Sequence, residues 1–83
     1  LDKKEIKVFP NPSRDYVNII LPLDHSASTM KIYDIIGNMI FSEKIIESKF
    51  EYKINLDDFR SGIYQLLIIS NDKIITEKLE VYK

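Results

Sequence analysis

Short runs of apolar residues, separated by polar turn residues, recur along the whole 83-residue chain. In the clearest run, residues 50–56, apolar and polar positions alternate strictly. Alternation with a period of two places apolar side chains on one face of a strand and polar side chains on the other. The pattern predicts seven strands: Glu5–Phe9, Tyr16–Leu21, Met30–Ile35, Met39–Ile45, Phe50–Leu56, Ile63–Ser70 and Lys73–Tyr82. The fold class expected is all-β, a seven-stranded antiparallel immunoglobulin-like β-sandwich with at most one helical turn, near Asp57–Ser61.

Turn residues divide these strands. Pro10 and Pro12 stop the first strand, because a proline has no N–H to donate to a β ladder. Gly37 and Asn38 predict a tight turn, since both residue types tolerate a positive φ. The polar stretch 24–28 predicts a solvated loop between the second and third strands. Each of these segments favours a reversal of the chain direction.

The last two strands can be placed in register from their turn. A two-residue turn at Asn71-Asp72 sets Ile68 opposite Ile75. This register assigns the following residues to the core: Tyr64, Ile68, Ile75, Leu79 and Val81. It places an apolar spot on the opposite face: Leu67, Ile69 and Ile74. The spot has two open interpretations, either scattered surface apolar residues or a contact patch for a partner or for the rest of a parent chain.

Composition supports the β assignment and narrows the function. Fifteen residues are isoleucine and one is alanine, which suits strands better than helices. Twelve Lys and Arg against thirteen Asp and Glu give a net charge of −1, so we expect no nucleic-acid partner. No apolar run approaches the roughly 20 residues of a membrane helix, so we expect no direct membrane insertion. The chain starts at Leu1, not Met, which predicts a piece of a longer protein: residues 1–4 end a linker and residues 5–83 form one domain.

Side chains that carry catalysis or bind metals are scarce. Cysteine is absent, which excludes disulfides and thiolate metal sites. His25 is the single histidine, and we interpret it as an ordinary solvated loop residue. Asp57-Asp58 fits turn or cap chemistry, because a calcium loop needs alternating acidic residues and a distal glutamate. We therefore expect no enzyme activity, no metal and no cofactor.

Several short motifs occur in order along the chain: Pro10-Asn11-Pro12, then Tyr33-Asp34 with Gly37, then Gly62 with Tyr64, and finally Lys78-Leu79 with Val81 and Lys83. In this order and spacing, the chain resembles the C-terminal sorting domain of the type IX secretion system, type A, also called the Por secretion system sorting domain. The resemblance covers about residues 7–83. Arg60 departs from the family pattern, because many members have proline two residues before the glycine that Gly62 matches.

The resemblance implies a folded export signal. Domains of this family look like seven-stranded immunoglobulin-type sandwiches at the C-terminus of secreted proteins. It implies an N-terminal cargo domain in the parent chain, recognition in the periplasm by an outer-membrane translocon, and delivery to the cell surface or the extracellular space. It also implies removal of the domain by a sortase-like cysteine protease. The alternative is an immunoglobulin-like spacer or a carbohydrate-binding module of an extracellular enzyme, which would present an exposed aromatic row.

The motif residues also have structural interpretations. Asp34 can hold the amides of the turn that Gly37 permits, and Asn11 can bond neighbouring backbone. Gly62 would permit a close approach of the backbone. The ring of Tyr64 belongs to the core, and its hydroxyl can bond a nearby carbonyl, as in a tyrosine corner. For these residues a purely structural role is the alternative to recognition.

Recognition from outside needs exposed side chains or an unpaired strand edge, and the last strand is predicted to offer both. The candidates for recognition are Lys78, Lys83, Leu67, Ile69 and Ile74. For the two lysines, the alternative is that they protect an edge strand from aggregation.

Overall fold

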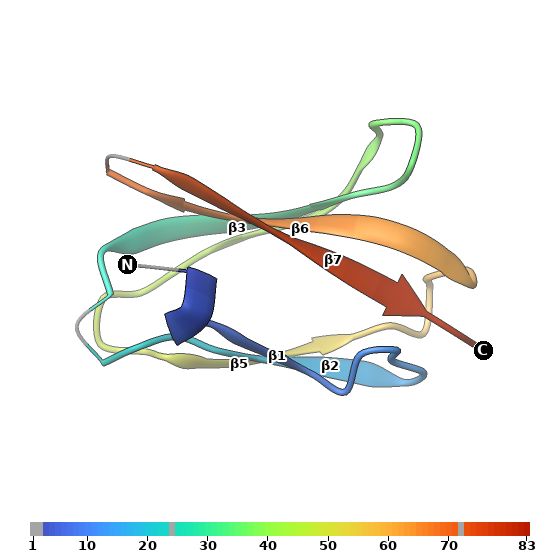
Figure 1. Cartoon of the computed structure of the whole chain (residues 1–83), viewed down its shortest axis with the longest axis horizontal. Helices are drawn as coiled ribbons and strands as arrows, with labels where there is room; N and C mark the ends of the chain where they lie inside the picture. The colour runs from blue at the N-terminus through green and yellow to red at the C-terminus, as the bar shows by residue number, and fades with distance from the viewer. Residues whose placement is uncertain (1–2, 24, 72) are drawn as a thin grey trace.

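Seven β-strands and one short 3₁₀ turn make up the fold (Figure 1). The computed structural model describes residues 3–23, 25–71 and 73–83. The elements are η1 (Lys3–Glu5), β1 (Lys7–Phe9), β2 (Tyr16–Ile20), β3 (Ala27–Tyr33), β4 (Met39–Lys44), β5 (Glu51–Asn55), β6 (Gly62–Ser70) and β7 (Ile74–Val81). Each strand falls within three residues of a run that the alternation pattern predicts.

The strands form two antiparallel sheets that face each other (Figure 1). One sheet has three strands in the order β1-β2-β5, and the other has four in the order β4-β3-β6-β7. Each sheet buries one face against the other, which is the way a sandwich removes the apolar side of a half-buried strand from water. The prediction of a seven-stranded antiparallel sandwich is confirmed.

The core lies between the sheets and draws on both of them. Among its residues, Ile19 comes from β2, Met30 and Ile32 from β3, and Leu66 from β6, and all four are fully buried. Neighbouring apolar pairs split across the two faces, as in β2, where Ile19 is fully buried and Ile20 is half-buried. The alternating apolar positions of the sequence therefore correspond to side chains that alternate between the core and the outer face of a sheet.

The β6–β7 hairpin has the predicted register. Ile68 pairs with Ile75 and Tyr64 pairs with Leu79. The N–H of Ser70 donates to the carbonyl of Lys73 at 2.9 Å, which closes the turn. Asp72, the second turn residue, lies outside the described residues. The five residues assigned to the core from this register are all buried: Tyr64, Ile68, Ile75, Leu79 and Val81.

Two local predictions are corrected, both at the start of a strand. The first strand begins at Lys7 rather than Glu5, because Lys3–Glu5 form the 3₁₀ turn η1. Phe50 lies before β5 begins and is 36% exposed, so it does not share the buried face of that strand. The segment Asp57–Ser61 stays within the predicted limit of one turn, which is closed by the N–H of Phe59 donating to the carbonyl of Leu56 at 2.9 Å.

The prediction that His25 is a solvated loop residue is wrong. His25 is 5% exposed, and its Nε2 donates to the carbonyl of Lys49 at 2.9 Å. The backbone N–H of His25 also donates to the carbonyl of Pro22 at 3.1 Å. The polar composition of residues 24–28 does not predict the burial of His25, because the burial depends on the distant loop that contains Lys49.

Candidate functional site

The motif segments all lie toward one end of the sandwich. In the strand registers, the end of β1, the start of β2 and the end of β5 lie together, as do the end of β3, the start of β6 and the end of β7. Figure 1 shows the loops before β2 and before β6 at the right of the view beside the C-terminus, and the turn between β3 and β4 above them at the upper right. We call this the motif end, formed by loops 10–15, 34–38 and 56–61 and by residues 78–83.

Asn11 joins the loop 10–15 to β7. Its Nδ2 donates to the carbonyl of Lys78 at 2.8 Å, and its Oδ1 accepts from the N–H of Glu80 at 2.9 Å. The carboxamide offers one donor and one acceptor, so it pairs with β7 as a peptide group of a neighbouring strand would. The prediction that Asn11 bonds neighbouring backbone is corrected, since its partners lie 67 and 69 residues along the chain.

Ser13 continues this pairing along β7. Its N–H donates to the carbonyl of Glu80 at 2.7 Å, and its own carbonyl accepts from the N–H of Tyr82 at 2.8 Å. The Ser13 hydroxyl donates to the carbonyl of Pro10, and the residue is 1% exposed. The edge of β7 is thus hydrogen-bonded from Lys78 to Tyr82, and the expectation of an unpaired edge there is wrong.

Asp34 organises the turn between β3 and β4. Its Oδ1 accepts from the N–H of Asn38 at 2.8 Å and from the N–H of Ile36 at 3.1 Å. Gly37 has a φ of +93°, which glycine adopts without steric cost, and its N–H donates to the Asp34 carbonyl at 3.1 Å. The hydrogen bond from the Asn38 amide lowers the pKa of the Asp34 carboxyl below its ordinary value, and desolvation opposes this in part. The predicted role of Asp34 as the holder of the turn amides is confirmed.

Tyr64 fixes the corner between β5 and β6. Its hydroxyl donates to the carbonyl of Arg60 at 2.7 Å, and its buried ring meets Phe59 edge to face at 5.2 Å. This is the predicted tyrosine-corner contact, and it forms although Arg60 is not proline. The close backbone approach predicted at Gly62 is wrong, since an added Cβ there would meet no atom within 4 Å.

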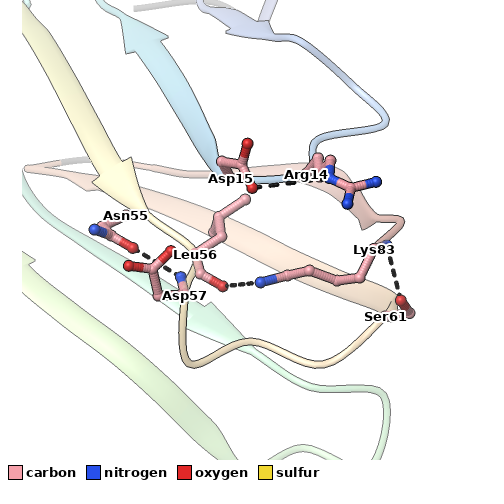
Figure 2. A network of polar contacts seen from close by, with 7 residues as sticks. All are labelled: Arg14, Asp15, Asn55, Leu56, Asp57, Ser61 and Lys83. Atoms are coloured by element: carbon pink, nitrogen blue, oxygen red, sulfur yellow. Dashed lines mark hydrogen bonds and ion pairs between the residues drawn. The ribbon is translucent and has the colours of Figure 1, made fainter.

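Lys83 ties the end of the chain to the same corner. Figure 2 shows its Nζ donating to the carbonyl of Leu56 at 2.6 Å and its N–H donating to Oγ of Ser61 at 2.9 Å. The ammonium is therefore bonded within the domain. The structure gives Lys83 a tethering contact and leaves Lys78 as an exposed lysine of the motif end.

The recognition candidates lie in two separate places. Lys78 pairs with Gln65 on the outer face of the four-stranded sheet, near the motif end. The apolar spot lies on the same face at the other end, where Ile69 pairs with Ile74 beside the β6–β7 turn. Ile74 is 59% exposed, whereas Leu67 and Ile69 are half-buried.

The chemistry of the motif end is that of hydrogen bonds and exposed side chains. Within the described residues, no three or more His, Cys, Asp or Glu side chains form a group that could hold a metal ion. The described ranges also contain no helix that is long and apolar enough to cross a membrane.

Comparison with known proteins adds family and fold. The family model described as the secretion system C-terminal sorting domain matches residues 7–82. An ulvan lyase of Nonlabens ulvanivorans is 34% identical over 77 residues, which are 92% of this chain and 14% of the lyase. A thiol protease/hemagglutinin of Porphyromonas gingivalis is 41% identical over 44 residues, which are 53% of this chain and 5% of the protease. The chain thus spans a small part of these relatives.

A solved structure supports the architecture. The crystal structure of a DUF3244 family protein from Bacteroides vulgatus, which has an immunoglobulin-like β-sandwich fold, superposes with a TM-score of 0.76. The match covers 92% of this chain and 83% of that one. At 19% sequence identity the similarity concerns the fold.

Proposed function

Because the chain belongs to the family of type IX secretion system C-terminal sorting domains, we propose that the outer-membrane translocon recognises it in the periplasm as a folded signal. Sorting domains of this family direct the export of cargo proteins to the cell surface or the extracellular space. The observation that carries the proposal is the placement of the motif segments at one end, where Asn11 and Ser13 of the first motif bond β7, which carries the last one. A surface built from distant segments distinguishes a folded domain from an unfolded tail.

Lys78 is the side chain that we expect the translocon to contact. It is exposed, and its backbone carbonyl is held by the Asn11 carboxamide. A side chain on a fixed backbone loses less conformational entropy on binding than one on a mobile segment. Lys83 acts indirectly in this proposal, because its ammonium bonds the carbonyl of Leu56.

The cargo and the protease belong to the same proposal. The relatives are much longer than this chain, which supports an N-terminal cargo domain in the parent protein. A sortase-like cysteine protease would remove the domain after export by cutting before Lys3, where the described fold begins with η1. The domain itself serves as a signal without catalysis in this proposal, which its family and its immunoglobulin-like fold support.

The exposed aromatic side chains give little support to the alternative of a carbohydrate-binding module. Phe9 and Tyr16 are the exposed aromatic residues of β1 and β2, at 46% and 40% exposure. The ammonium of Lys53 lies 4.3 Å from the centroid of the Tyr16 ring, so one face of that ring is already covered. A sugar-binding row needs ring faces that are open to the ligand.

A reporter fusion tests the function. Residues 1–83 are fused to the C-terminus of a periplasmic reporter in a host with a type IX secretion system, and the reporter is expected at the cell surface. A reporter that stays in the periplasm would contradict the function.

A substitution in the same fusion tests the contact by Lys78. Lys78→Glu is expected to lower the amount of reporter at the surface about tenfold or more at unchanged thermal stability. Lys44→Glu is the matched control, because Lys44 is an exposed lysine of β4. Normal export of the Lys78→Glu fusion would remove Lys78 from the recognised surface.

A further inference from the structure

Exposed apolar side chains gather at the motif end. Most of the large apolar side chains that are exposed in the described part of the chain lie there: Phe9, Tyr16, Ile35, Ile36, Met39, Ile40, Ile63 and Tyr82. The densest group is Ile35, Ile36, Met39 and Ile40, which we call the apolar tip. It spans the turn after β3 and the first two residues of β4. This group differs from Leu67, Ile69 and Ile74, which lie at the other end.

The two isoleucines of the tip are presented on a fixed backbone. Ile35 and Ile36 are 82% and 81% exposed, the largest values among the described large apolar residues. Their turn is held by the carboxylate of Asp34, which accepts from the N–H groups of Ile36 and Asn38. The N–H of Asp34 also donates to the Asn38 carbonyl at 2.9 Å. Tight turns favour polar residues and glycine, so two exposed isoleucines in such a turn need an explanation other than turn formation.

A binding partner accounts for this arrangement. Exposed apolar surface gains free energy when it is removed from water, and anchors of protein interfaces are preorganised side chains that enter pockets. We propose that the apolar tip is a docking knob, with Ile35 and Ile36 entering an apolar groove on a protein of the export machinery. This inference rests on the proposed function and deepens it, since it names a second contact in addition to Lys78.

The charges around the tip favour a protein over a lipid surface. Residues 34–40 contain Asp34 and neither lysine nor arginine, and the basic residues of β3 and β4 are Lys31, which pairs with Ser42, and Lys44 at the far end of β4. Binding to anionic lipid depends on basic residues next to the apolar group, and acidic residues oppose it. The tip also leads into β4, which has a single neighbour, β3, in its sheet. A strand edge can hydrogen-bond a partner polypeptide, which an acyl chain cannot do.

The test uses the reporter fusion with a double substitution and a matched control. Ile35→Ser with Ile36→Ser removes the knob and leaves the Asp34 hydrogen bonds, which are made to backbone amides. Leu23→Ser with Ile46→Ser is the control, because these side chains are 74% and 60% exposed and lie at the other end. We expect surface reporter to fall about tenfold or more for the tip variant and to stay within about twofold for the control. Both variants are expected to melt at the same temperature as the unaltered domain.

The outcomes separate this inference from the function. If the unaltered fusion stays in the periplasm, the proposed function fails. If the unaltered fusion and the stable tip variant reach the surface equally, the docking knob is wrong. Binding of the purified chain to vesicles of phosphatidylethanolamine and phosphatidylglycerol, lost in the tip variant, would replace the protein partner by a membrane. A dimer in sedimentation velocity, lost in the tip variant, would replace it by a second copy of this chain. A monomer without vesicle binding, together with the loss of export, supports the proposal.

Discussion

At the scale of single residues, side-chain groups of this domain stand in for missing backbone partners. The Asp34 carboxylate and the Tyr64 hydroxyl do this locally, with partners four residues away or fewer. The Asn11 carboxamide and the Lys83 ammonium do it over 67 and 27 residues. The sequence predicts the local contacts, because turn chemistry depends on nearby residues. It does not predict the distant ones, since the packing of the strands decides which backbone groups lie beside Asn11 and Lys83.

Asn11→Ala tests the bond between the first loop and β7. The substitution removes a donor and an acceptor that satisfy Lys78 and Glu80, so we expect the free energy of unfolding to fall by about 1–3 kcal/mol. Urea denaturation measures the change. Asn11→Asp keeps the acceptor for Glu80 and loses the donor to Lys78, so it should also lower the free energy of unfolding. An Asn11→Ala protein as stable as the unaltered one would show that the carboxamide adds nothing to the fold.

His25→Ala tests the buried histidine. The substitution removes the donor to Lys49 and leaves a cavity under the loop, so we expect a loss of about 2 kcal/mol in the free energy of unfolding. His25→Gln, which keeps an N–H donor, should lose less. A loss below about 0.5 kcal/mol would match a solvated loop residue, as the sequence alone predicts, and would contradict the burial.

At the scale of elements, contacts that follow one another in the sequence are the predictable ones. The β6–β7 register follows from a two-residue turn, and the β3–β4 turn follows from Gly37-Asn38. The start of β3 at Ala27 and the η1 turn do not follow from alternation, because they depend on distant segments: Ala27 pairs with Ser70 of β6, and η1 contacts β7. The β3–β4 turn has a further property that can be measured, because its central group is a carboxylate.

Asp34 makes this turn sensitive to acid. Its pKa in the folded domain is lowered, chiefly by the Asn38 amide, so the carboxylate stabilises the fold at pH values above the ordinary pKa of an aspartate. This contribution is lost as the pH falls through the lowered pKa of the folded state. Asp34→Asn keeps an oxygen acceptor without the titrating charge. Denaturation of both proteins between about pH 7 and pH 2 should show their stability difference shrinking as the pH falls. A constant difference would contradict the role of the charge.

At the scale of the whole molecule, the fold class is predictable and the assembly of the site is not. Strand number and sandwich class follow from alternation and from the spacing of turns, since each strand must bury one face. The sharing of strands between the sheets is decided by packing, and it brings loops 10–15, 34–38 and 56–61 to one end. The resemblance to a family identifies the motif residues, and the structure shows that Ser13, which the motif analysis missed, is buried directly after Pro12.

The two sheets should unfold as one unit. Neither a three-stranded nor a four-stranded sheet covers its own apolar face, and Ser13, next to β2, is hydrogen-bonded to β7 of the other sheet. Val17 of β2 and Leu79 of β7 are both fully buried in the common core, so their methyl groups report on the two sheets separately. In urea, the NMR signals of both methyl groups should be lost at the same midpoint. A lower midpoint for Leu79 than for Val17 would show that β7 detaches on its own, and the motif end would then be a strand held only loosely by Asn11 and Ser13.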